Sequence, residues 1–222
     1  MQEKNGVNSS GAHITILGGG VAGLSAGYYA KKKSLPFTVY ESRNQAGGLC
    51  ATYRHGDFSF DCGAHRFHDK DPDVILVALF LDKEYVTKSA TVYFPSPECP
   101  FTRVYEPGNR NAGMSPRGKT SLVAEIPCDK DSRFWKMDDE QLEKIVMDEM
   151  REIGWVRRED LLGSRVVKVP FAYPIIEKDT QNYLDGIQSY LKQFTNLKIS
   201  GRSGLFRYSW IHNMIRFGKE MV

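Results

Sequence analysis

A glycine-rich segment near the start of the chain constrains the fold most strongly. Residues 18–23 read Gly-Gly-Gly-Val-Ala-Gly and match the pattern G-x-G-x-x-G. They directly follow the β-rich run His13–Leu17, and the composition of residues 21–33 favours a helix. A strand, a glycine turn and a helix in this order predict the start of a Rossmann-like α/β fold.

Each glycine of the pattern has a predicted role at a bound dinucleotide. Gly18 allows the tight turn, Gly20 lets the backbone approach a pyrophosphate, and Gly23 permits close packing of helix on strand. The pyrophosphate would lie on the free amides that open the helix, at Val21 and Ala22. The alternative is a glycine-rich surface turn that binds nothing.

An acidic residue follows at the distance expected for ribose recognition. A second strand is predicted over Phe37–Tyr40, and Glu41 follows it, 18 positions after Gly23. In dinucleotide-binding folds an acid about 20 residues after the glycines accepts hydrogen bonds from the adenosine ribose. An acid also disfavours a 2′-phosphate, so NADP is not expected.

The next segment carries a family resemblance. Arg43 is followed by Gly47 and Gly48, and this R-x-x-x-G-G resembles the second FAD fingerprint of a flavoprotein superfamily. That superfamily includes amine oxidases, protoporphyrinogen oxidases, phytoene desaturases and UDP-galactopyranose mutases. The resemblance implies that Arg43, Gly47, Gly48 and the adjoining Leu49 lie against FAD. A solvated arginine before a glycine turn is the alternative.

Two further segments extend the resemblance. Residues 58–68 are similar to the D-x-G-x-H segment of the superfamily, which implies that Gly63, Ala64 and His65 line the flavin. His65 and His68 could instead be solvated loop residues, and no metal site is needed. Near the end, the G-R-x-G-x-F-x-Y stretch over 201–208 implies FAD contacts at Gly201 and Arg202.

The C-terminal segment is expected to form a strand over 196–200, a glycine turn and a helix over 210–221. A helix N-terminus directed at the cofactor would favour its negative charge. Members of the superfamily commonly carry an acid a few residues after the tyrosine. This chain has Trp210-Ile211-His212 there and so departs from the superfamily's pattern at that contact.

The middle of the chain predicts a β-rich domain with a packing helix. Strand-like runs occur at Val74–Leu81 and Ala90–Phe94, and a helix is predicted after an Asp138 cap, with Gln141 three residues on and Gly154 at its end. Another helix is expected over 181–194.

We therefore expect a Rossmann-like FAD-binding domain of the glutathione reductase-like type, in two parts, 1–73 and 155–222. Residues 74–154 would be the reduced remnant of a substrate domain. Relatives carry a long segment between blocks similar to residues 65–73 and 74–94, which are adjacent here. This adjacency indicates an internal deletion.

Composition excludes several classes of function. The 30 basic and 27 acidic residues give a net charge of +3, too balanced for a nucleic-acid partner. The longest apolar run is far shorter than the roughly 20 residues that cross a bilayer. Four cysteines without a C-x-x-C pair indicate neither zinc nor disulfides. A polar N-terminus predicts a cytoplasmic protein. The oligomeric state stays open.

Three functional hypotheses remain. The first is an FAD-dependent oxidoreductase that transfers hydride from a C–N or C–C bond of a small molecule to the flavin. The second is a mutase-like isomerase, for which arginines clamping a diphosphate would be diagnostic, and Arg103 alone does not decide it. The third is a shortened FAD-binding protein without turnover. No catalytic acid, base or nucleophile is identified.

Overall fold

The computed structural model describes residues 13–62 and 71–222. The chain divides into two compact units: the first comprises the part up to Gly48 together with Asn182–Val222, and the second comprises Leu49–Gln181. The domain limits expected after residues 73 and 154 both fall inside the second unit, so the sequence-based division and the compact units differ.

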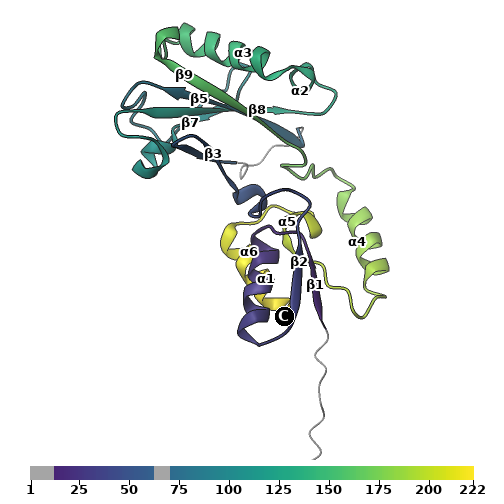
Figure 1. Cartoon of the computed structure of the whole chain (residues 1–222). Coiled ribbons are helices and arrows are strands. Elements are labelled where there is room, and N and C mark those ends of the chain that lie inside the picture. Colours follow the sequence, from purple (N-terminus) through teal and green to yellow (C-terminus); the bar gives the residue numbers. More distant parts are fainter. Residues whose placement is uncertain (1–12, 63–70) are drawn as a thin grey trace, which may run out of the picture. The chain divides into compact units, whose positions relative to one another are not determined.

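The first unit opens with the expected βαβ element. Strands β1 (Ile14–Leu17) and β2 (Phe37–Tyr40) pair in parallel, and helix α1 (Val21–Lys32) connects them (Figure 1). The helix approaches β2 closely, because a Cβ atom on Gly27 would lie 2.8 Å from the ring of Phe37. Within the described residues this sheet has only these two strands.

The C-terminal helix packs on α1. Helix α6 (Ile211–Glu220) meets α1 where Gly218 has no side chain, and a Cβ atom there would lie 2.4 Å from the carbonyl oxygen of Ala22. The Ser25 hydroxyl of α1 donates to the carbonyl of Ile215 at 2.8 Å. A glycine and a serine thus allow the two helices to approach closely.

The segment before α6 differs from the sequence-based expectation. The expected helix is present as α4 (Thr180–Leu191), but residues 197–200 form no strand and lead into the single turn α5 (Gly201–Gly204). A strand requires a hydrogen-bonded neighbour, and β1 pairs only with β2 among the described residues. The local β pattern is therefore not realised.

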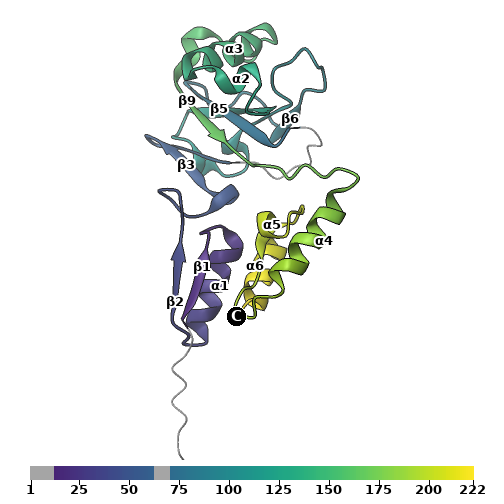
Figure 2. The same cartoon turned by 90° about the vertical axis from the view of Figure 1, so that its right-hand side faces the viewer.

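The second unit is built on a five-stranded antiparallel sheet (Figure 2). Its order is β6-β7-β8-β5-β9, with bounds Thr91–Tyr93 for β6, Arg103–Tyr105 for β7, Thr120–Cys128 for β8, Asp73–Leu81 for β5 and Leu161–Val169 for β9. The shorter pieces are α2 (Arg133–Lys136) and 3-10 turns at Gly48–Cys50, Pro107–Asn109, Ala112–Met114 and Arg158–Asp160.

Strand β5 is buried along its whole length because both faces of the sheet are covered. Helix α3 (Asp139–Glu152) packs on one face (Figure 1). On the other, the hairpin of β3 (Thr52–His55) and β4 (Phe58–Asp61) places aromatic rings against Phe80 of β5. A fully covered strand reads as a continuous apolar run, as the sequence shows.

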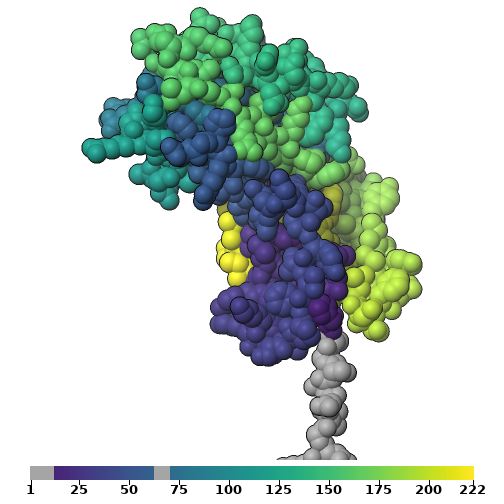
Figure 3. All heavy atoms as spheres, in the orientation of Figure 1, coloured from purple at the N-terminus to yellow at the C-terminus, as the bar shows by residue number. Residues whose placement is uncertain are grey.

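Helix α3 begins as the sequence predicts. The Asp138 carboxylate accepts from the Gln141 amide at 2.8 Å, and the Gln141 side chain accepts from the Asp138 amide, which forms a capping box. Gly154 follows the helix with a φ of +76°. In the space-filling view α3 and β9 lie on the outside of the second unit (Figure 3).

No helix in the described part of the chain is long and apolar enough to span a membrane.

Candidate functional site

The glycine turn of the first unit has the geometry that its spacing predicts. Gly18 has a φ of +107°, and its amide donates to the carbonyl of Tyr40 at 2.7 Å. A Cβ atom on Gly23 would lie 2.0 Å from the carbonyl oxygen of Gly18, so only glycine fits there. A Cβ atom on Gly20 would meet no atom of the described residues within 4 Å, so these residues leave open space in front of this backbone.

This open space lies at the N-terminus of α1. Gly20 is the N-cap residue in an extended conformation, no side chain of the described residues caps the helix, and its first turn holds no acidic residue. Among residues 13–62 and 71–222, therefore, no carboxylate caps the opening amides at Val21 and Ala22. Uncapped amides at the positive end of a helix dipole suit a phosphate.

The second glycine pair lies directly on the first turn. The Gly47 amide donates to the carbonyl of Gly19 at 2.8 Å, and Gly47 pairs with Gly20 as an isolated parallel bridge. Gly47 and Gly48 have φ values of +119° and +58°. A Cβ atom on Gly48 would lie 3.2 Å from the Cα atom of Gly20. The close approach of the two backbones and the positive φ values therefore explain why glycine occupies positions 47 and 48.

Glu41 holds the turn together. Its Oε2 accepts from the Gly19 amide at 2.7 Å, and its Oε1 accepts from the Arg43 amide at 3.0 Å. The bonds from Arg43 and Gly19 lower the pKa of Glu41 below its ordinary value. Two carboxylate oxygens offer about four acceptor positions, so ribose hydroxyls can still bind. The protein contacts add a structural role to the predicted cofactor role.

Gly19 is a residue that the sequence reasoning missed. Both of its backbone polar groups are used, the amide by Glu41 and the carbonyl by Gly47. A Cβ atom on Gly19 would lie 3.1 Å from the Glu41 Oε2 atom. The sequence does contain a signal for this role: the G-x-G-x-x-G motif allows any residue at position 19, and this chain has a glycine there.

The other residues predicted to contact FAD near the N-terminus differ in exposure, in the unit to which they belong, and in whether the structure describes them. Arg43 is exposed, and Leu49 is half-buried and belongs to the second unit. Gly63, Ala64 and His65, together with His68, lie outside the described residues.

The turn at Gly201 adjoins the start of α1. Gly201 is buried with a φ of +84°, and a Cβ atom there would lie 3.4 Å from the Cβ of Ala22. The Arg202 guanidinium lies over the Tyr208 ring at 5.1 Å. Thus Gly201 of the C-terminal segment and the glycine turn of the N-terminal segment meet within the first unit.

Arg103, weighed above as a diphosphate ligand, is already engaged in the second unit. It is buried on β7, and its Nε donates to Glu125 Oε2 at 2.6 Å while Nη2 pairs with Oε1. The charge of Arg103 is therefore balanced by the protein itself.

Potential metal ligands and cysteines occur in both described ranges, 13–62 and 71–222. There, no three histidine, cysteine or acidic side chains are grouped to hold a metal ion. The four cysteines are free thiols.

Comparisons with known proteins agree with this geometry. The family of NAD(P)-binding Rossmann-like domains matches residues 16–80. Protoporphyrinogen oxidase 2 of Arabidopsis thaliana is 32% identical over 65 residues, and an L-amino acid oxidase of Crotalus durissus cumanensis is 38% identical over 64 residues. These similarities support the superfamily resemblance indicated by the sequence.

Each match covers only part of either protein. The segments matched in the two relatives amount to 29% of this chain and 13% of each relative. Protoporphyrinogen oxidase of Nicotiana tabacum is 28% identical over 40% of this chain and 20% of its own length. The chain therefore spans a small fraction of the relatives that it matches.

Solved structures confirm the fold. A reduced UDP-galactopyranose mutase is similar with a TM-score of 0.58 and 19% identity, over 67% of this chain and 32% of that one. A putative protoporphyrinogen oxidase from Exiguobacterium has a TM-score of 0.53 and 13% identity, over 67% of this chain and 33% of that one. The Rossmann-like α/β fold expected from the sequence is thus confirmed.

Proposed function

We propose that the first unit binds FAD and that the chain acts as an FAD-dependent oxidoreductase on a small molecule. The observation that carries the proposal is the bond from the Gly47 amide to the Gly19 carbonyl, which brings two glycine fingerprints together at an uncapped helix end. A plain surface turn requires neither the second glycine pair nor open space in front of Gly20.

The residues present fit a dinucleotide. The amides that open α1 would bind the pyrophosphate, Glu41 would accept from the ribose, and Arg43 would lie beside the phosphates. The turn at Gly201 and Arg202 would close the other side. Glu41 also disfavours a 2′-phosphate, which supports FAD over NADP.

FAD, when bound, supplies hydride chemistry at C–N or C–C bonds. The residues of this chain would bind and orient the cofactor. The names of the relatives, protoporphyrinogen oxidase and L-amino acid oxidase, support oxidation of a small molecule. The specific substrate and a cytoplasmic location stay predictions.

Two alternatives differ from this proposal. A mutase-like isomerase is supported by the structural similarity to the mutase, but the pairing of Arg103 with Glu125 leaves that arginine less suited to hold a diphosphate. A shortened FAD-binding protein without turnover is supported by the two-stranded sheet of the first unit within the described residues.

The visible spectrum of the purified protein tests the cofactor proposal. We expect flavin absorbance that persists after reconstitution with FAD and removal of excess cofactor. The Glu41→Ala variant should retain less FAD than His65→Ala. Equal retention by the Glu41 variant and the parent would contradict the ribose assignment, and absence of absorbance in the parent would reject FAD binding altogether.

Anaerobic assays of the FAD-bound protein separate the three functions. Bleaching of the flavin by amines or porphyrinogens would support the oxidoreductase. Conversion of UDP-galactofuranose after reduction with dithionite would support the isomerase instead. Stable FAD binding with neither reaction would support the protein without turnover.

A further inference from the structure

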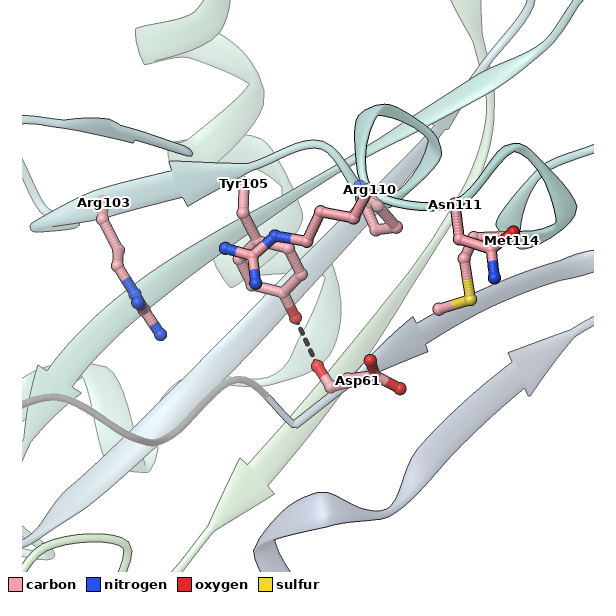
Figure 4. Close-up of a pocket in the computed structure, with 7 residues that line it drawn as sticks. Asp61, Arg103, Tyr105, Arg110, Asn111 and Met114 are labelled. Carbon is pink, nitrogen blue, oxygen red and sulfur yellow. Dashed lines mark hydrogen bonds between the residues drawn. The ribbon is translucent and has the colours of Figure 1, made fainter. Parts of the chain in front are cut away.

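The second unit contains a cavity of about 140 Å³ beside β7 (Figure 4). Its volume is close to the roughly 150 Å³ of a protein cavity that holds benzene. Strands β4 and β7 and the turns after β7 contribute side chains of three kinds: the acid Asp61, the polar or charged Arg103, Arg110 and Asn111, and the apolar or aromatic Tyr105, Pro107 and Met114.

Tyr105 is the rigid wall of this cavity. The side chain is buried, and its hydroxyl donates to the backbone carbonyl of Asp61. Figure 4 shows the ring held in this orientation, with the Arg110 guanidinium alongside it. The guanidinium carbon of Arg110 lies 5.8 Å from the ring centre. Together with Met114, the ring provides an apolar surface for one small ring or short chain.

The two arginines at the cavity differ in their charge balance. Arg103 is buried and paired with Glu125. Arg110 is exposed, and its Nη2 donates to the hydroxyl of Thr91 at 2.7 Å, a neutral partner. Among the described residues, no carboxylate oxygen lies within salt-bridge distance of Arg110. Its positive charge is therefore available to a ligand.

Two further groups define which ligand fits. The Asn111 side-chain oxygen accepts from the Gly113 amide at 2.9 Å, so its amide nitrogen is the group left to donate. Asp61 also lines the cavity, and its Oδ1 accepts from the Thr52 hydroxyl at 2.5 Å. The carboxylate of Asp61 would repel a second negative charge on the same ligand.

We propose that this cavity binds a small monoanionic carboxylate with an apolar body. The carboxylate would bind Arg110, and the apolar body would lie on Tyr105 and extend toward Met114 (Figure 4). Arginine matches the planar shape of a carboxylate, and the aromatic surface buries the remainder. Every residue involved belongs to the second unit, so the proposal does not depend on FAD binding by the first unit.

Calorimetric titration of the full chain with benzoate at low salt tests the ligand class. We expect benzoate to bind about tenfold more tightly than benzyl alcohol, because only the anion forms charge-assisted bonds with Arg110. Terephthalate should bind more weakly than benzoate because Asp61 repels its second carboxylate. Absence of benzoate binding, or tighter binding of benzylamine than of benzoate, would overturn the proposal.

Matched charge variants test the location. Arg110→Gln should weaken benzoate binding about tenfold through loss of the charged donor. Arg117→Gln removes the same charge from an exposed position outside the cavity lining and should leave the affinity unchanged. Equal affinities of the two variants would overturn the assignment. Because flavin absorbance is recorded separately, failure here is distinct from failure of the FAD proposal.

Discussion

Gly47 donates its backbone amide to the carbonyl of Gly19 at 2.8 Å, which joins two glycine motifs separated by α1 and β2. The approach leaves no room for side chains, because a Cβ atom on Gly48 would already contact the Cα atom of Gly20 at 3.2 Å. The glycine turn at residues 18–23 and the glycine pair at residues 47–48 therefore form one continuous backbone surface.

Gly20→Ala and Gly23→Ala should affect two different properties, FAD affinity and folding stability. A Cβ atom on Gly20 meets no atom of residues 13–62 and 71–222 within 4 Å, so Gly20→Ala should fold normally and lose FAD affinity about tenfold by occupying cofactor space. Gly23→Ala should lose about 1–3 kcal/mol of stability, since its Cβ meets the Gly18 carbonyl. Thermal unfolding and flavin absorbance measure the two effects. Equal FAD affinity of Gly20→Ala and the parent would count against the pyrophosphate position.

Glu41 should make the first unit sensitive to acid. Amides of Arg43 and Gly19 lower its pKa from the ordinary 4.5, so its stabilising contribution is complete above that value and is lost as pH falls through the lowered pKa. In Glu41→Gln, the free energy of unfolding should depend less on pH in this acid range, as measured by unfolding curves at a series of pH values. Glu84→Gln, at an exposed position in the second unit, serves as the control and should retain the acid dependence.

Removing one partner of the buried Arg103 and Glu125 pair should be costly. Arg103→Met leaves a buried carboxylate without its cation and should destabilise the second unit by about 3–5 kcal/mol. The double variant Arg103→Met/Glu125→Leu should recover most of this loss, because no lone charge remains. Denaturant unfolding followed by the fluorescence of Trp135 and Trp155 measures both. A double variant as unstable as the single one would refute this account.

Cys128 should resist alkylation in the folded protein. Burial raises the pKa of its thiol to about 12, so almost no thiolate exists at pH 8. Cys50 is exposed and should react with iodoacetamide first. Peptide mapping by mass spectrometry checks the order, and denaturant should make all four cysteines reactive. Rapid labelling of Cys128 in the folded protein would contradict this prediction and would show that the C-terminal end of β8 unfolds locally.

Gly218→Ala should loosen α6 from α1. Its Cβ would lie 2.4 Å from the carbonyl oxygen of Ala22, and the adjoining backbone allows little adjustment. We expect faster hydrogen exchange in α6 and a lower melting temperature. Gly186→Ala on α4, where a Cβ atom meets no described atom within 4 Å, should neither speed exchange in α6 nor lower the melting temperature. Unchanged exchange in Gly218→Ala would contradict close helix packing.

Local sequence patterns predicted several elements because local interactions form them. The capping box of Asp138 and Gln141 spans three residues and needs no distant partner. The expected strand over 196–200 is wrong because a strand needs a neighbour, and none pairs with it in the described part of the chain. Short β-rich runs depend on pairing more than helices do.

By itself, the sequence determined the strand, turn and helix around Gly18 to Gly23, since glycine conformational freedom and spacing are local properties. Tertiary structure decided how that turn is completed. It brought Gly47 onto Gly19, engaged the Glu41 carboxylate with backbone amides, and paired Arg103 with Glu125. These contacts join residues distant along the chain, and only packing fixes which buried polar groups become partners.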